Sequence, residues 1–159
     1  MAFAGKRILI TGATSGIGAA TAEAFCKAGC EELILVGRRE ELLKERAKAW
    51  SDAYGVDVAA VVLDVGSRAD IEGIARDHPN LFEVDILVNN AGLAKGRDAM
   101  QDAELDDWEE MVQTNVLGAQ NVIEAALDAG VCCPRDECRR SCLRGGQRAL
   151  VYRSWLKYF

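Results

Sequence analysis

One stretch decides how this 159-residue chain folds: Ile8-Leu9-Ile10-Thr11-Gly12-Ala13-Thr14-Ser15-Gly16-Ile17-Gly18. Its apolar residues 8–10 predict a buried strand, and the alanine-rich residues 19–25 behind the glycines predict a helix. A strand, a glycine-rich turn and a helix form a phosphate-binding element, because the start of the helix offers free N–H groups and a partial positive charge to an anion.

The three glycines of this stretch have separate structural reasons. Gly12 allows a tight turn because glycine tolerates a positive φ, Gly16 lets the backbone approach a pyrophosphate, and Gly18 lets the helix pack close to the strand. Their spacing, G-x-x-x-G-x-G, differs from the usual dinucleotide fingerprint G-x-G-x-x-G. A glycine-rich turn in an unrelated α/β protein is therefore the alternative at this point.

The composition is that of an ordinary globular domain. Half of the residues are apolar and 28% are charged. No apolar run approaches the ~20 residues that span a bilayer, and residues 1–7 lead into no apolar segment typical of a secretory signal. We therefore expect a cytoplasmic protein without a membrane partner, whose six cysteines are reduced thiols rather than a disulfide framework.

Apolar runs and helical patterns alternate four times along the chain. The expected strands are residues 8–10, 33–36, 58–63 and 86–88. The expected helices are residues 16–28, 40–54 and 67–77, followed by one long helix or a pair of helices over 105–129. Continuous apolar strands between amphipathic helices indicate a parallel sheet covered on both faces. Right-handed crossovers make it a Rossmann-type, doubly wound α/β sheet of order 3-2-1-4, which we expect to stop after the fourth strand and the helix behind it.

Two arginines follow the second strand in Gly37-Arg38-Arg39. This place, about 20 residues past the glycine loop, is where an acidic residue for the ribose 2′-OH of NAD is expected. Arginine instead donates hydrogen bonds in a fork that suits a phosphate, so Arg38 and Arg39 favour NADP over NAD. The alternative is that both are solvated charges at a helix start, where Glu40 and Glu41 also fit.

Polar residues also follow the next two strands and lie in the last helix. Small residues and amides in Asn89-Asn90-Ala91-Gly92 leave room for a ligand at the carboxyl end of a central strand. Asp64 follows the third strand. It could contact a ligand there, but a role as a turn or helix-cap residue fits at least as well. Asn115, in Thr114-Asn115-Val116, is either a site residue or a helical asparagine whose amide lies in solvent.

These motifs, in this order and at this spacing, resemble the short-chain dehydrogenase/reductase family over residues 5 to about 125. Within the family, the Arg-Arg pair and the run from Asn89 to Ala94 look most like the NADP-dependent 3-hydroxy acid (serine) dehydrogenase group. The resemblance implies hydride transfer between NADP(H) and a small-molecule alcohol or carbonyl. A homo-oligomer is one further expectation.

The resemblance also implies a role for each site residue. Pyrophosphate contacts are expected at Gly12, Ser15, Gly16, Ile17 and Gly18. Contacts to the 2′-phosphate are expected at Arg38 and Arg39, to the adenine at Asp64 with its neighbour Val65, and on the inner ribose side at Asn90, Ala91 and Gly92. Asn115 matches the family's catalytic-site asparagine, which helps to hold a water and the active-site lysine.

The sequence lacks the residues that transfer protons in this family. Its chemistry needs a serine on a fifth strand and a tyrosine with a lysine four residues later, because positions i and i+4 share one face of a helix. In this sequence the residue four after Tyr54 is Val58, and the residue four after Tyr152 is Leu156. Lys157 comes one position late and is rotated by about 140°. We therefore expect no appreciable dehydrogenase activity from this chain.

The composition changes abruptly after Gly130. Residues 1–130 carry 12 Lys/Arg against 23 Asp/Glu, whereas residues 131–159 carry 7 against 2 together with four cysteines. The expected apolar strand near residues 135–142 is absent there, which leaves the fourth strand as an exposed edge. We interpret 1–130 as an incomplete NAD(P)-binding domain and 131–159 as an atypical Cys/Arg-rich tail from a shifted frame or an alternative splice.

Two other interpretations of the tail are weaker. Its cysteines lie at Cys132, Cys133, Cys138 and Cys142, a spacing that lacks the paired C-x2-C of structural zinc sites, so we expect no metal. Its arginines form no nucleic-acid-binding motif and the main body is acidic, so we expect no nucleic-acid partner. A catalytically dead NADP(H)-binding or interaction module, and a poorly folded product, remain the alternatives to an enzyme.

Overall fold

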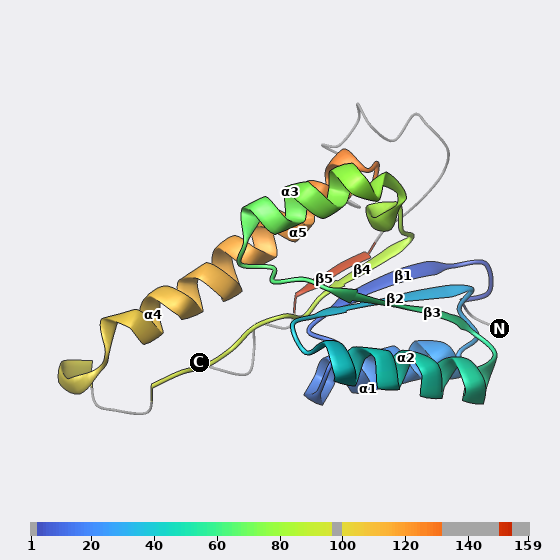
Figure 1. Ribbon diagram of the computed structural model, residues 1–159, viewed down its shortest axis with the longest axis horizontal. Coiled ribbons are helices and arrows are strands. Elements are labelled where there is room, and N and C mark those ends of the chain that lie inside the picture. The colour runs from blue at the N-terminus through green and yellow to red at the C-terminus, as the bar shows by residue number, and fades with distance from the viewer. Residues whose placement is uncertain (1–2, 97–99, 132–149, 154–159) are drawn as a thin grey trace.

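A five-stranded parallel sheet with helices on both faces forms the protein (Figure 1). The computed structural model describes residues 3–96, 100–131 and 150–153. The strand order is β3-β2-β1-β4-β5, and every neighbouring pair is parallel. Helices α1 and α2 cover one face, whereas α3 and α5 cover the other (Figure 1). The Rossmann-type, doubly wound sheet that the sequence predicts is therefore confirmed.

The elements follow the predicted alternation closely. The strands are β1 (Arg7–Thr11), β2 (Glu32–Gly37), β3 (Asp57–Val62), β4 (Ile86–Asn89) and β5 (Leu150–Arg153). The α-helices are α1 (Gly16–Lys27), α2 (Glu40–Tyr54), α3 (Arg68–Asp77), α4 (Leu105–Val112) and α5 (Ala119–Asp128). Two short 3-10 helices, η1 (Pro79–Phe82) and η2 (Met100–Asp102), and a π-helical turn, η3 (Gln113–Gly118), complete the described elements.

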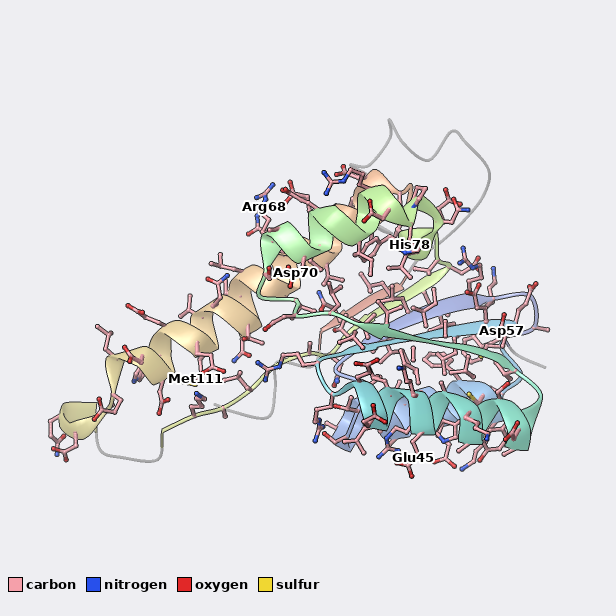
Figure 2. All side chains as sticks on the ribbon, viewed as in Figure 1. Glu45, Asp57, Arg68, Asp70, His78 and Met111 are labelled. Atoms are coloured by element: carbon pink, nitrogen blue, oxygen red, sulfur yellow. The ribbon has the colours of Figure 1, made fainter. Side chains whose placement is uncertain are left out.

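Side chains of the central strands alternate between two cores. From β1, Ile8 and Ile10 pack toward α1 and α2, whereas Leu9 packs toward α3 and α5. All three are fully buried. A strand covered on both faces has no polar side, which is why these strands are continuously apolar. Charged residues such as Glu45 occupy the outer side of α2, away from the sheet (Figure 2).

Local signals mark the beginnings and ends of the helices where the sequence predicts them. The Ser67 hydroxyl accepts a hydrogen bond from the Asp70 N–H at 3.3 Å and so caps α3. Gly29, Gly55 and Gly130 all have a positive φ just beyond a helix end. Of the two alternatives over 105–129, one long helix or a pair, the structure has the pair, because η3 separates α4 from α5. No helix among the described residues combines the length and the apolar character needed to cross a membrane.

The prediction that the fourth strand is an exposed edge is wrong. Strand β5 pairs with β4 over four residues, from Ile86 opposite Leu150 to Asn89 opposite Arg153. The physical reason is that an uncovered parallel strand presents a row of free N–H and C=O groups, and a short apolar segment can satisfy them. Part of the predicted atypical tail thus belongs to the same sheet, whereas residues 135–142 lie outside the described residues.

Candidate functional site

The carboxyl ends of β1 to β4 meet at one edge of the sheet. Because the strands are parallel, the segments that follow them lie side by side there, and this is where doubly wound sheets bind ligands. The segments begin at Gly12, Arg38, Leu63 and Asn90. They contain all the predicted cofactor residues, with Asn115 facing them from η3.

The glycine loop packs directly against the end of β4. Gly12 has φ +68°, and a side-chain carbon on it would lie 2.9 Å from the Ala91 Cα. A carbon on Gly18 would lie 2.3 Å from the Gly12 carbonyl oxygen and 2.5 Å from the Asn90 Nδ2. The tight turn at Gly12 and the close packing at Gly18 are confirmed.

Gly16 differs from the other two glycines of the loop. Its φ is +56°, and a side-chain carbon there would meet nothing within 4 Å. A backbone conformation that favours glycine therefore coincides with open space in front of the start of α1. This vacant space beside the backbone fits the close approach of a pyrophosphate.

The first turn of α1 is not capped by the protein itself. Ser15 is the N-cap residue, but its side chain makes no capping hydrogen bond, and the first turn contains no acidic residue. By contrast, α3 has both the Ser67 cap and Asp70. The N–H groups and the positive end of the α1 dipole are thus left for an anion. Ile17 is partly exposed and lines a shallow hollow together with Phe3 and Phe25.

The two arginines point to different partners. Arg39 donates through Nη2 to the Thr14 hydroxyl at 2.6 Å and to the Ser15 hydroxyl at 2.7 Å, so it holds the glycine loop. Arg38 faces Asp64 at 3.8 Å and Glu110 of α4 at 3.9 Å, and its side chain is more than half exposed. Both arginines are exposed at this edge, but Arg39 is hydrogen-bonded to the glycine loop at short distances, whereas Arg38 faces its carboxylates at longer ones.

Asp64 stabilises a turn and also faces Arg38. Its Oδ1 accepts from the Gly66 N–H at 2.9 Å, which is a turn role, while its Oδ2 faces Arg38. Val65 is buried, and its carbonyl accepts from the Asn121 Nδ2 at 3.1 Å. Val65 thus belongs to the core cluster that includes Val122 and Ala126 of α5.

A buried network that the sequence analysis missed joins β1 to β4. The Thr11 hydroxyl donates to the Asn89 Oδ1 at 3.1 Å and accepts from the N–H groups of Asn90 and Ala91 at 3.0 and 2.9 Å. The Asn89 amide also donates to the Ala119 carbonyl at 2.8 Å. This network fixes the strand ends that line the site. The polar residues at the ends of two apolar strands were the only available signal.

Asn115 holds the loop that follows β4. Its Oδ1 accepts from the Leu93 N–H at 2.9 Å, and its Nδ2 donates to the Leu93 carbonyl at 2.8 Å. The interpretation of Asn115 as an amide in solvent is therefore wrong. Asn115 lies within the π-helical turn, a distortion that is common at functional sites, and its oxygen lies against Gly92.

Among the side chains that the structure describes, Tyr54 and two thiols are the natural candidates for proton transfer, and they are engaged or buried. The hydroxyl of Tyr54 donates to Glu23 at 2.8 Å. This hydrogen bond raises the pKa of Tyr54, the opposite of what a tyrosine acid–base catalyst needs. Cys26 and Cys30 are free, buried thiols, and burial raises the pKa of Cys26 to about 12. Within the described ranges, no group of three or more His, Cys, Asp or Glu side chains could hold a metal ion.

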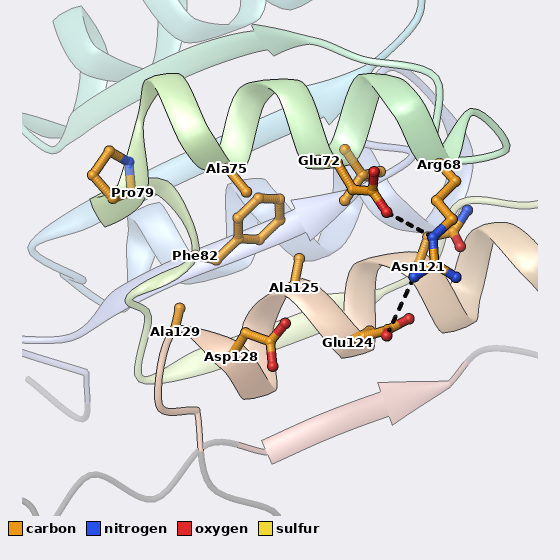
Figure 3. Close-up of a pocket in the computed structure, with 11 residues that line it drawn as sticks. Arg68, Glu72, Ala75, Pro79, Phe82, Asn121, Glu124, Ala125, Asp128 and Ala129 are labelled. Carbon is orange, nitrogen blue, oxygen red and sulfur yellow. Dashed lines mark hydrogen bonds and ion pairs between the residues drawn. The ribbon is translucent and has the colours of Figure 1, made fainter.

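A groove between α3 and α5 contains none of the predicted site residues (Figure 3). Phe82 forms part of its apolar floor, and Arg68 bridges Glu72 and Glu124 at one end, at 2.7 and 3.5 Å. The groove lies on the outer layer of helices, and it includes none of the residues of the glycine loop. The edge at the carboxyl ends of the strands remains the candidate site.

Comparison with known proteins identifies the family. The model of the short chain dehydrogenase family matches residues 6–131. The chain belongs to the short-chain dehydrogenase family. The chain is 44% identical over 124 residues to an NADP-dependent 3-hydroxy acid dehydrogenase of Schizosaccharomyces pombe, covering 77% of this chain and 48% of that protein. It is 46% identical over 121 residues to sulfoacetaldehyde reductase 2 of Chromohalobacter salexigens, covering 76% and 47%.

Solved structures of other family members are also similar. L-Sorbose reductase from Gluconobacter frateurii, complexed with NADPH and L-sorbose, matches with a TM-score of 0.71 and 31% identity, over 80% of this chain and 48% of that one. Serine dehydrogenase from Escherichia coli matches with a TM-score of 0.68 and 37% identity, over 79% and 56%. The resemblance to the hydroxy acid (serine) dehydrogenase group is confirmed. The chain spans about half the length of the curated relatives it matches.

Proposed function

We propose that this chain binds NADP(H) at the carboxyl ends of β1 to β4. The observation that carries the proposal is the uncapped start of α1, with open space beside Gly16 and a largely exposed Arg38 on the neighbouring strand end. Backbone N–H groups at the start of α1 would bind the pyrophosphate, and the Arg38 guanidinium would bind the 2′-phosphate. NADP-dependent relatives and a relative with bound NADPH support the same choice of nucleotide.

The remaining site residues would orient the nucleotide. Asp64 would receive the adenine, and the segment from Asn90 to Gly92, anchored by Thr11 and Asn115, would face the inner ribose. A bound NADPH would supply a hydride for an alcohol or carbonyl of the hydroxy acid type, which is the reaction we propose for this lineage. Asn115 would keep the loop after β4 in place during that reaction.

We further propose that this 159-residue chain binds the nucleotide without turning over substrate. The sequence contains no Tyr-x-x-x-Lys, and a tyrosine with a pKa near ~10 needs a cationic neighbour to exchange protons at neutral pH. Tyr54 is hydrogen-bonded to Glu23 instead. Turnover of NADPH with a carbonyl substrate by the pure protein would refute this part of the proposal.

Two observations bear on where and how the protein acts. Free thiols at Cys26 and Cys30 fit the reducing cytoplasm, which we propose as its location. Leu105, Trp108 and Val112 expose apolar side chains along α4, which supports a homo-oligomer, a state that light scattering would measure.

Calorimetric titration tests nucleotide binding. We expect NADPH to bind at least about tenfold more tightly than NADH, because a charge-assisted arginine–phosphate contact contributes about 1.5–3 kcal/mol. Arg38→Gln should remove this preference, whereas Arg76→Gln, which removes an exposed arginine from α3, should keep it. A monodisperse wild-type protein that shows no heat of binding with NADPH would refute the proposed function.

A further inference from the structure

Arg46, on α2, makes a contact that the proposed nucleotide site does not explain. Its Nε donates a hydrogen bond to the Thr14 carbonyl oxygen at 3.1 Å. The guanidinium also lies over the Trp50 ring, 5.6 Å from the centroid, and Trp50 is buried in the core beneath α2. A cation over a tryptophan face is attracted by the ring, so a rigid side chain holds the guanidinium in place.

The contact at the Thr14 carbonyl sets the direction of the next N–H. The C=O of Thr14 and the N–H of Ser15 belong to one trans peptide unit, in which the two bonds point to opposite sides. When Arg46 holds the oxygen on the α2 side, the Ser15 N–H is turned away from α2. Ser15 is the N-cap residue of α1, with the extended angles φ −163° and ψ 173°, and it directly precedes Gly16.

Arg39 does not replace this contact. Arg39 holds the side chain of Thr14, through two hydrogen bonds to its hydroxyl at 2.6 and 3.2 Å. A hydrogen bond to a hydroxyl leaves the peptide plane after Thr14 free to rotate, whereas a hydrogen bond to the carbonyl oxygen does not. The positive charge at the oxygen also polarises the peptide, which makes its N–H a stronger donor.

We propose that Arg46 is a positioning residue that aims the Ser15 N–H at the nucleotide pyrophosphate through the Thr14 carbonyl. This inference rests on the proposed NADP(H) binding. Arg46 acts on the far side of the peptide from the ligand and contacts the ligand only through that peptide. It therefore contributes to binding of the pyrophosphate but not of the 2′-phosphate.

Two ligands separate this role from a general effect of charge or folding. NADPH carries a pyrophosphate, whereas adenosine 2′-monophosphate carries only the 2′-phosphate. We expect Arg46→Met to weaken NADPH binding about tenfold, as for the loss of one hydrogen bond to a charged group. Binding of adenosine 2′-monophosphate should stay within about twofold. Lys48→Met, which removes an exposed positive charge from the same helix, should change neither.

Amide chemical shifts measure the positioning directly, without any ligand. In the ¹H–¹⁵N spectrum, Arg46→Met should shift the Ser15 and Gly16 amides, Arg46→Lys should shift them less, and Lys48→Met should leave them in place. Equal weakening of both ligands by Arg46→Met, or unmoved amides in both Arg46 variants, would overturn the inference. If the wild-type protein binds no NADPH, the proposed function fails, and the amide shifts still decide whether Arg46 orients this peptide.

Discussion

Replacing Gly18 by alanine tests the close packing on which the glycine loop depends. Gly18 lies in α1 and its φ is not positive, so alanine meets no backbone strain there. The added carbon, however, would lie 2.3 Å from the Gly12 carbonyl oxygen and 2.5 Å from the Asn90 Nδ2. Both are held in place, because Asn90 Nδ2 itself donates to the carbonyls of Thr11 and Gly12. The loop must therefore move away from β4.

The expected loss of stability follows from three contributions. Overpacking a well-packed site costs about 1–3 kcal/mol, and loosening the two Asn90 hydrogen bonds costs about 0.5–1.5 kcal/mol each. Alanine in a helix instead of glycine regains about 1 kcal/mol. These contributions add to about 1–5 kcal/mol, so we expect Gly18→Ala to lower the free energy of unfolding by about 3 kcal/mol.

Gly73→Ala is the matched control. Gly73 lies inside α3, and the nearest atom to an added carbon is the flexible end of Arg76, at 3.8 Å. This variant should gain up to about 1 kcal/mol from helix propensity alone. Urea unfolding followed by circular dichroism should then separate the two midpoints by about 1–4 M, from a slope of about 1–3 kcal/mol/M. Equal midpoints, or a stabilised Gly18→Ala, would refute the reasoning.

Two further substitutions test buried polar groups. Thr11→Val removes the hydroxyl that joins Asn89 to the N–H groups after β4, so the unfolding free energy in urea should fall by about 2–4 kcal/mol, whereas Thr11→Ser should lose less. Burial opposes the charge of Asp85, but hydrogen bonds from Lys6 and the Arg7 N–H hold its pKa below the ordinary value. Asp85→Asn should therefore cost about 1–3 kcal/mol at neutral pH, and its deficit should close as the pH falls through the folded pKa. A deficit that stays constant down to pH 2 would contradict this assignment.

The strands and helices could be predicted because their signals are local. Apolar runs specify β1, β2 and β4, and the Ser67 cap and the positive-φ glycines specify the helix ends, since each depends only on neighbours in the chain. Strand β5 escaped prediction because its four residues sit in a charged, cysteine-rich segment. Its stability comes from pairing with β4, and that pairing has no local signature.

The partners of the site residues depend on contacts between distant parts of the chain. From the sequence we predicted that Arg38 and Arg39 both contact one phosphate. In the tertiary structure Arg39 is hydrogen-bonded to the glycine loop, and Arg38 faces Asp64. Adjacent residues at the end of a strand point to opposite sides, so their neighbours differ. Asn115 was identified from its motif, while its attachment to Leu93 came only from the fold.

By itself, then, the sequence determined the order of the elements, the parallel sheet and the glycine-rich turn, because backbone preference and hydrophobic periodicity act over a few residues. Only the tertiary structure decided which groups meet at the strand ends. The Thr11 hydroxyl is hydrogen-bonded to Asn89, 78 residues away in the chain, and Arg46 is hydrogen-bonded to the Thr14 carbonyl, 32 residues away. Such pairs form because the folded sheet brings the carboxyl ends of its strands together and buries polar groups that must then be hydrogen-bonded.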